Sequence, residues 1–253
     1  MVNQTTNRLV VRWWKGVVIG VLTACPRGCV LYYTFMQCIW TTGFVIFTLV
    51  SSLAAGSWPE LDLPVELRAS NAALEESILE RGRGIALKEG DALPEFGLVN
   101  QAGAIVRTSD LQGKVFVLNF IFTRCQVAQM CPASTSRMAG LQREAPAKGL
   151  PGLRFVTITF DPGYDTPAVL RRYAKTFGIA DHNFDLLTYP REGFIESLLY
   201  LFGILTREEN DTITHNSVTF LVDAEGRVAL KQRGPDWSAE QFIEAARALM
   251  DGA

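Results

Sequence analysis

The sequence predicts an α/β domain whose mixed central sheet is covered by helices on both faces. The first observation is a run at residues 115–122 that is apolar except for Asn119, which is rich in β-branched and aromatic side chains and suits a strand buried on both faces. The second is the alternation of strand-type and helix-type segments after this run, a pattern typical of parallel strands joined by helical crossovers. The third is a hairpin signal on each side of this region, at residues 100–103 and 223–226.

The expected elements follow in order along the chain. A hairpin over residues 93–107 comes first, and a turn then leads into the buried strand. Pro132 lacks an N–H and has a φ angle preset for a helix, so we expect it at the first helical position of a helix that ends near residue 147. Thr166 and Ser238 are expected to cap later helices. The remaining strands and helices are expected at residues 153–160, 166–177, 184–188, 191–202, 218–222, 227–232 and 238–250.

Two cysteines follow the first central strand. Right-handed crossovers make the central strands parallel, and the C-terminal hairpin adds antiparallel strands at an edge, so the predicted arrangement is thioredoxin-like. Cys125 is expected in the loop after the strand and Cys131 at about the N-cap of the next helix. The partial positive charge of a helix N-terminus stabilises a thiolate and lowers the pKa of a cysteine. Open α/β sheets usually bind ligands at this edge.

Length and charge limit the classes of function. The chain has 253 residues and a formal net charge of −2, which indicates one globular domain with an appendage. There is no basic excess, so nucleic-acid binding has no support. The charge is unevenly distributed, however, because no acidic residue precedes Glu60, whereas several basic residues do.

An uncharged apolar stretch at residues 30–55 predicts an N-terminal transmembrane helix, which needs about 20 residues. Basic residues precede it and acidic residues follow from Glu60, so we expect the N-terminus in the cytoplasm and the domain outside. This predicts a single-pass inner-membrane protein with its domain in the periplasm or the equivalent intermembrane space. A cleaved signal peptide with its cleavage site at residues 52–56, and a start at Met36, remain alternatives.

The chain therefore divides into three predicted parts. Residues 1–56 form a basic segment and the membrane anchor or signal. Residues 57–90 form a linker with a short helix near residues 69–81, expected to pack on the domain or the membrane surface. Residues 91–253 form the thioredoxin-like domain.

Cysteine usage separates the anchor from the domain. Cys25, Cys29 and Cys38 lie in or beside the apolar stretch, with no histidine nearby, so no metal site is predicted there. The domain keeps only Cys125 and Cys131. In an oxidising compartment these two form a disulfide unless a metal or a reductant prevents it.

His215 is the third predicted donor. It precedes the strand that opens the C-terminal hairpin, and in a thioredoxin-like topology this segment packs beside the cysteine loop. Thiolates select Cu(I) or zinc, and imidazole suits copper in either oxidation state. A structural zinc site normally takes four ligands, and the sequence offers no clear fourth. We therefore expect copper, as Cu(I) or Cu(II), bound by Cys125, Cys131 and His215.

Three motifs resemble those of the Sco/SenC copper-chaperone family. They are FTRC…CP at residues 122–132, the Asp-Pro and Asp-Thr-Pro segments within residues 161–167, and THNSVTFLVDAEG at residues 214–226. The resemblance covers roughly residues 91–253. It implies a thioredoxin-like domain that hangs from a membrane anchor on the outer side and serves assembly of the dinuclear copper centre of cytochrome c oxidase.

The resemblance also implies partners and residue roles. The partners are the oxidase subunit that carries this copper site, or another copper chaperone, and the protein is a metallochaperone rather than an enzyme. Cys125, Cys131 and His215 fall on the metal ligands of the family. Asp161 falls on its Asp-Pro motif, which supports the ligands or the fold.

The cysteine spacing departs from the family pattern. The family has C-x3-C with a proline after the first cysteine, whereas here the spacing is C-x5-C with Gln126 in that place. Residues six apart on a continuous helix rise about 9 Å and point to different faces. Both sulfurs therefore meet one metal only if residues 126–130 form a loop that doubles back. A disulfide likewise needs Cα atoms about 4.4–6.8 Å apart.

Three other functions stay open. The first is a thiol–disulfide oxidoreductase that reduces a partner's cysteines, with one cysteine attacking and the other resolving the mixed disulfide. The second is a peroxidase of the peroxiredoxin kind, for which Arg124 is suitable but the Thr/Pro pattern of the loop is absent. The third is a structural domain with a stapling disulfide, which the placement of the pair beside a buried strand disfavours.

Overall fold

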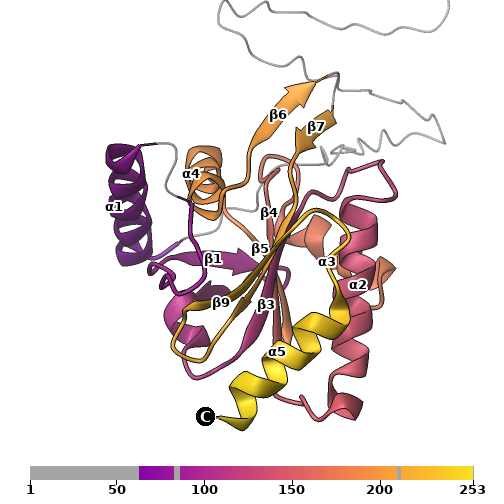
Figure 1. The fold of residues 1–253 in the computed structure, drawn as a ribbon. Coiled ribbons are helices and arrows are strands. Elements are labelled where there is room, and N and C mark those ends of the chain that lie inside the picture. The colour runs from indigo at the N-terminus through magenta and orange to yellow at the C-terminus, as the bar shows by residue number, and fades with distance from the viewer. Residues whose placement is uncertain (1–62, 83–85, 210–211, 253) are drawn as a thin grey trace, which may run out of the picture. The chain divides into compact units, whose positions relative to one another are not determined.

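The computed structural model describes residues 63–82, 86–209 and 212–252 (Figure 1). The predicted apolar stretch at residues 30–55 and the three cysteines in or beside it lie outside these residues. In the described part of the chain, no helix combines the length and the apolar character that a membrane span requires.

A mixed seven-stranded sheet forms the centre of the domain (Figure 1). Its strands are β1 (Gly97–Asn100), β2 (Ile105–Arg107), β3 (Phe116–Ile121), β4 (Arg154–Thr159), β5 (Phe184–Thr188), β8 (Val218–Val222) and β9 (Val228–Arg233). Their order in the sheet is β2-β1-β5-β4-β3-β8-β9. Strands β3, β4 and β5 are parallel, whereas the hairpins at the two edges are antiparallel. The predicted mixed sheet is confirmed.

Strand β3 lies inside the sheet, as its apolar sequence predicts. All six of its residues are buried, because both faces of this strand pack against side chains of covering helices. It pairs with β4 in parallel from Phe116↔Arg154 to Ile121↔Thr159. The loops that follow Ile121 and Thr159 therefore emerge next to each other at one edge of the sheet.

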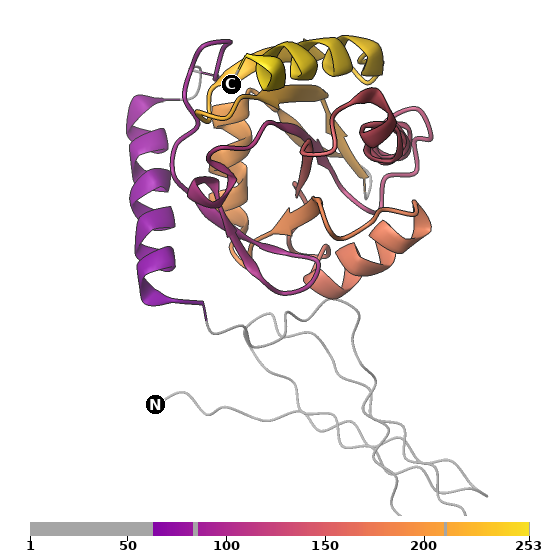
Figure 2. The ribbon, with the colours of Figure 1, turned by 90° about the horizontal axis from the view of Figure 1, so that it is seen from below.

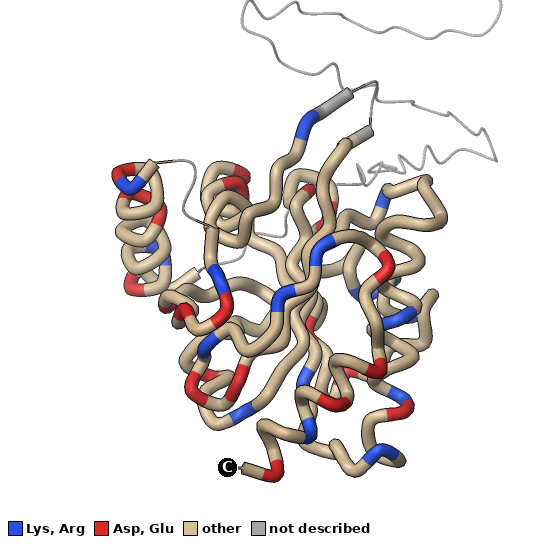
Figure 3. The backbone as a smooth tube through the Cα atoms, in the orientation of Figure 1, with Lys and Arg blue, Asp and Glu red and all other residues tan. Residues whose placement is uncertain are grey.

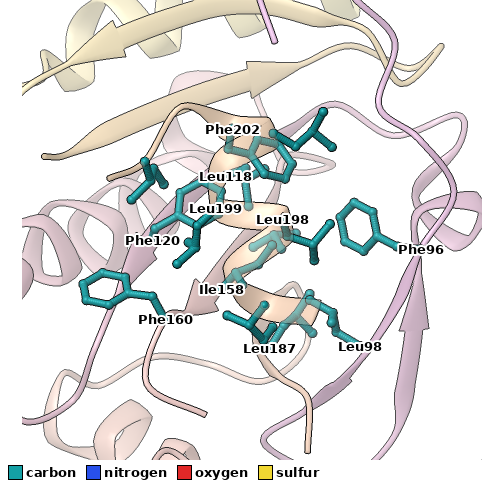
Figure 4. Packing of buried hydrophobic residues seen from close by; sticks show 14 of the residues in the cluster. Phe96, Leu98, Leu118, Phe120, Ile158, Phe160, Leu187, Leu198, Leu199 and Phe202 are labelled. Carbon is teal, nitrogen blue, oxygen red and sulfur yellow. The ribbon is translucent and has the colours of Figure 1, made fainter. Parts of the chain in front are cut away.

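Helices cover both faces of the sheet (Figures 1 and 2). Their bounds are α1 (Val65–Arg81), α2 (Cys131–Glu144), α3 (Pro167–Thr176), α4 (Glu192–Phe202) and α5 (Ala239–Asp251). Buried residues of α2, α3 and α5 pack in one apolar cluster with one face of the sheet. Those of α1 and α4 pack in a second cluster with the other face. Figure 4 shows part of this second cluster, in which Phe202 of α4 lies against Phe120 of β3 with ring centroids 5.0 Å apart.

Helix α1 packs directly on the domain. The side-chain amide of Asn71 donates to the Gly97 carbonyl oxygen at 2.8 Å and accepts from the Gly97 N–H at 3.1 Å. A Cβ on Gly97 would lie 2.4 Å from Leu67 Cδ1, so the absence of a side chain there allows this close approach. The helix begins at Val65, directly after Pro64 and earlier than predicted.

Charged residues of both signs are interspersed along the domain (Figure 3). Two ion pairs lie at opposite ends of β4. Arg124 contacts Asp161 just beyond the end of this strand, whereas Arg154 at its start contacts Asp185.

Candidate metal and thiol site

The predicted donors come from three segments beyond the C-terminal end of β3. Cys125 lies in the loop after this strand, and Cys131 is the first residue of α2. His215 is the last residue of β7 (Thr212–His215), which pairs with β6 (Thr206–Glu209) in a separate two-stranded sheet.

The longer loop between the cysteines does double back. Residues 126–130 are not helical, and the Met130 N–H donates to the Val127 carbonyl oxygen at 2.9 Å, which closes a turn. Helix α2 begins only after this turn, with Met130 at the N-cap. The prediction that Pro132 is the first helical residue is therefore wrong by one position, because the turn delivers Cys131 directly into the helix.

The two thiols are free and hydrogen-bonded to each other. A hydrogen bond from the Cys131 thiol lowers the pKa of the half-buried Cys125 to about 5, from an ordinary value near 9.0. The same hydrogen bond, together with burial, raises the pKa of Cys131. The negative charge therefore resides on Cys125, and Cys131 keeps the proton. The helix N-terminus, expected from the sequence to stabilise a thiolate, is outweighed at Cys131 by the hydrogen bond to Cys125 and by burial.

The ring of His215 lies against Cys131. Its Nε2 atom is 3.6 Å from the Cys131 Sγ, and its Nδ1 atom is 2.8 Å from the carbonyl oxygen of Asn216. A carbonyl oxygen only accepts, so Nδ1 carries a proton in this contact and the lone pair of a neutral ring is on Nε2, facing the sulfur. Phe160 and Phe122 hold the ring from the side, with centroids 4.5 and 6.1 Å away.

The β6–β7 hairpin was not predicted. The sequence indicated an irregular segment around His215, whereas this residue ends a strand and pairs with Thr206. The hairpin strands carry little apolar alternation, so the periodicity that reveals a half-buried strand is absent. Backbone pairing in this hairpin, rather than a loop, carries the imidazole.

A second loop approaches the cysteines from β4. Asp161 accepts hydrogen bonds from Arg124 Nε and Nη2 at 2.9 and 2.6 Å, and the guanidinium lies 4.6 Å from the centre of the Tyr164 ring. Arg124 directly precedes Cys125. Asp161 thus holds the cysteine loop, which agrees with the supporting role that its motif suggested.

Asp165 belongs to the Asp-Thr-Pro segment of the sequence motif, which by itself indicates only a residue before a helix. It is fully buried and accepts hydrogen bonds from Thr123 and Thr159. Burial raises its pKa to about 6. A carboxylate placed before a Thr-Pro helix start is normally a solvated turn residue, so the pattern carried no signal of this burial.

Within the described residues, no group of three or more His, Cys, Asp or Glu side chains has an arrangement that would hold a metal ion. The arrangement consists of pairwise contacts, from Cys125 to Cys131 and from Cys131 to His215.

Comparisons with known proteins converge on one family. The sequence model of the SCO1/SenC family matches residues 86–251. The SCO1 protein homolog of Bacillus subtilis is 31% identical over 142 residues, which cover 55% of this chain and 72% of that protein.

Solved structures share the fold. The SCO1/SenC family lipoprotein of Bacillus anthracis has a TM-score of 0.59 and 33% identity, over 65% of this chain and 99% of that one. BsSco, described as a member of the Sco family of cytochrome c oxidase assembly proteins with a disulfide switch, has a TM-score of 0.57 and 27% identity, over 65% and 97%. Arabidopsis thaliana ScoI, solved with copper bound, has a TM-score of 0.55 over 64% and 100%, and at 21% identity this likeness concerns the fold alone.

Proposed function

This chain belongs to the SCO1/SenC family, and from that premise we propose that it is a membrane-anchored copper chaperone. It binds copper through Cys125, Cys131 and His215 and delivers it for assembly of the dinuclear copper site of cytochrome c oxidase. The observation that carries the proposal is the placement of two free thiols beside an imidazole whose Nε2 atom lies 3.6 Å from the Cys131 sulfur.

The chemistry of the donors supports copper as the cargo. Two thiolates and one imidazole are soft and borderline ligands, which suit Cu(I) and remain suitable for Cu(II). The Nδ1–H of His215 is fixed by a backbone carbonyl, as it is in most metal-binding histidines. The half-buried Cys125 is the donor that an incoming ligand meets first, which suits transfer by stepwise ligand exchange.

The relatives support the choice of partner. BsSco belongs to a family of cytochrome c oxidase assembly proteins. For this chain we therefore propose the copper-site subunit of cytochrome c oxidase, or another copper chaperone, as the partner. Residues 30–55 anchor the chain in the inner membrane, with the domain on the periplasmic or intermembrane side, by the charge argument given above.

The thiol pair also favours a second function, the reduction of a partner's disulfide before metallation. Cys125, the half-buried thiol of low pKa, attacks one sulfur of the partner, and a mixed disulfide forms as the other partner sulfur leaves as a thiol. Cys131 then displaces the partner's second thiol, so the partner is reduced and this chain is oxidised to its disulfide.

Copper titration tests the first function. The full-length chain, in a mild detergent, is reduced without oxygen and titrated with copper while absorption is recorded. A Cu(II)–thiolate charge-transfer band that saturates at one equivalent supports the proposal, and a parent chain that shows no such band and retains neither Cu(II) nor Cu(I) refutes it.

His215→Ala separates the two functions. Loss of one of three donors is expected to lower copper affinity at least about 100-fold, whereas the rate of dithiol exchange stays within about twofold, because exchange needs only the sulfurs. His182→Ala, at the other histidine of the chain, is the matched control. Unchanged copper affinity in His215→Ala would show that the ligand assignment is wrong.

A further inference from the structure

Asp165 is a buried carboxylate that neither proposed function uses. It has no exposed surface. One carboxylate oxygen accepts from the Thr123 hydroxyl, and the other accepts from the Thr123 N–H at 3.0 Å and from the Thr159 hydroxyl. Because Thr159 ends β4 and Thr123 lies in the turn after β3, this carboxylate ties the turn to the neighbouring strand.

The turn held in this way leads directly to the first thiol. Thr123 lies two positions before Cys125, and the residue between them, Arg124, is held by Asp161 from the same loop. After Cys125, by contrast, residues 126–129 are exposed. The position of the Cys125 sulfur is therefore fixed by the two residues before it, Thr123 and Arg124.

Burial of Asp165 lowers the stability of the folded protein. None of the ion pairs found in the described residues includes it, and burial raises its pKa. An ionised carboxylate in such surroundings lowers the stability of the fold.

We propose that Asp165 is a positioning residue that, by holding the turn at Thr123, places the Cys125 thiol against Cys131. The inference extends the proposed function, because the thiol so placed is the one that meets copper or a partner disulfide. It predicts that the contact between the two sulfurs depends on the hydrogen-bond acceptors of Asp165 and not on its charge.

Two substitutions separate geometry from charge. Asp165→Ala removes every acceptor. Asp165→Asn removes the charge and keeps the contacts, because the amide oxygen accepts from the Thr123 N–H and the Thr159 hydroxyl while the Thr123 hydroxyl rotates to accept from the amide nitrogen. Asp185→Asn is the control for loss of a buried carboxylate, since Asp185 pairs with Arg154 at the opposite end of β4.

The readout is the equilibrium between the Cys125–Cys131 dithiol and its disulfide against oxidised and reduced dithiothreitol. It measures how well the two sulfurs are placed for bond formation. The full-length chain is used, without copper, and both cysteines fall in one tryptic peptide, residues 125–137, which mass spectrometry quantifies separately from the other three cysteines. A second readout is the pH profile of iodoacetamide alkylation at Cys125.

Asp165→Ala is expected to weaken the disulfide about tenfold and to raise the alkylation midpoint of Cys125 by about one pH unit, because the Cys131 hydrogen bond is lost. Asp165→Asn and Asp185→Asn are expected to match the parent in disulfide stability. Equal effects of Asp165→Ala and Asp165→Asn, or a folded Asp165→Ala that matches the parent, overturn the proposal.

A variant that fails to fold does not block the test. Thr123→Val keeps the shape of the side chain and removes the hydroxyl, and a disulfide weakened about threefold is then expected. An unchanged disulfide in folded Thr123→Val overturns the proposal in that case. Copper titration of the same preparations tests the chaperone function separately. A parent chain that binds no copper refutes that function, whereas the role of Asp165 is still tested by the disulfide equilibrium.

Discussion

Asp165→Asn is expected to stabilise the protein at neutral pH, and the effect is large enough to measure. Burial raises the pKa of this carboxyl from 3.8 to about 6. At 1.36 kcal/mol per pKa unit, this rise corresponds to about 3 kcal/mol of destabilisation once the group is ionised in both states. The asparagine removes that cost. For a domain of this size the gain corresponds to a rise in Tm of roughly 6–12 °C.

The stability difference between the parent and Asp165→Asn depends on pH, and its direction follows from the raised pKa of Asp165. Below about pH 4 the carboxyl is protonated in the folded and unfolded states, so parent and variant have similar stability. Between about pH 4 and 6 the folded state keeps a proton that the unfolded state releases, so the parent loses stability relative to the variant as pH rises. Above about pH 6 the difference is constant. The difference between the two curves, not either curve alone, isolates this residue from other carboxylates.

The assay is thermal unfolding by circular dichroism at a series of pH values from 4 to 8, for the parent, Asp165→Asn and Asp185→Asn. Asp185→Asn breaks the ion pair with Arg154 and is expected to destabilise the protein at pH 7.5, which is the opposite sign. A variant at Asp165 that is destabilised like the control, or a difference curve that is flat from pH 4 to 6, refutes the burial argument.

Three further predictions concern other parts of the domain. Cys131→Ala removes the hydrogen bond to Cys125 and is expected to slow alkylation of Cys125 at pH 6 by at least about tenfold; an unchanged rate contradicts the pairing of the thiols. Gly97→Ala forces a Cβ against Leu67 and is expected to cost about 1–3 kcal/mol in urea unfolding and to speed hydrogen exchange in α1; equal exchange would contradict the docking of this helix. Ser238→Ala removes the cap of α5 and is expected to cost about 1 kcal/mol, and a shift in urea midpoint checks it.

The central sheet was predictable because its signals are local. The run that became β3 is apolar on both faces, and the alternation of strands and helices leaves few topologies once crossovers are right-handed. The same rules place the loop after β3 beside the segment before β8. That is why two distant parts of the sequence, around Cys125 and around His215, were expected to meet.

The details of the site depend on tertiary contacts that leave little trace in the sequence. The turn over residues 126–130 has no glycine or proline to announce it, and the β6–β7 hairpin lacks apolar alternation. The hydrogen bond between the two thiols decides which of them is ionised, and burial raises the pKa of Asp165; both depend on neighbours set by the tertiary fold. Sequence reasoning located the chemistry but not its electrostatics.

The geometry of His215 bears on both proposed functions. Both functions use Cys125 as the group that a partner meets first, since it is the more exposed and more acidic thiol. Thiol exchange needs one attacking sulfur and one resolving sulfur, and the ring contacts only the resolving one, Cys131. A ring whose Nδ1–H is held by a backbone carbonyl, and whose other nitrogen faces a sulfur, also has the orientation of a metal-binding histidine. In the metal-free protein the Nε2 lone pair is placed to accept a hydrogen bond from the Cys131 thiol, and a metal bound between the ring and the thiols would take the place of that proton.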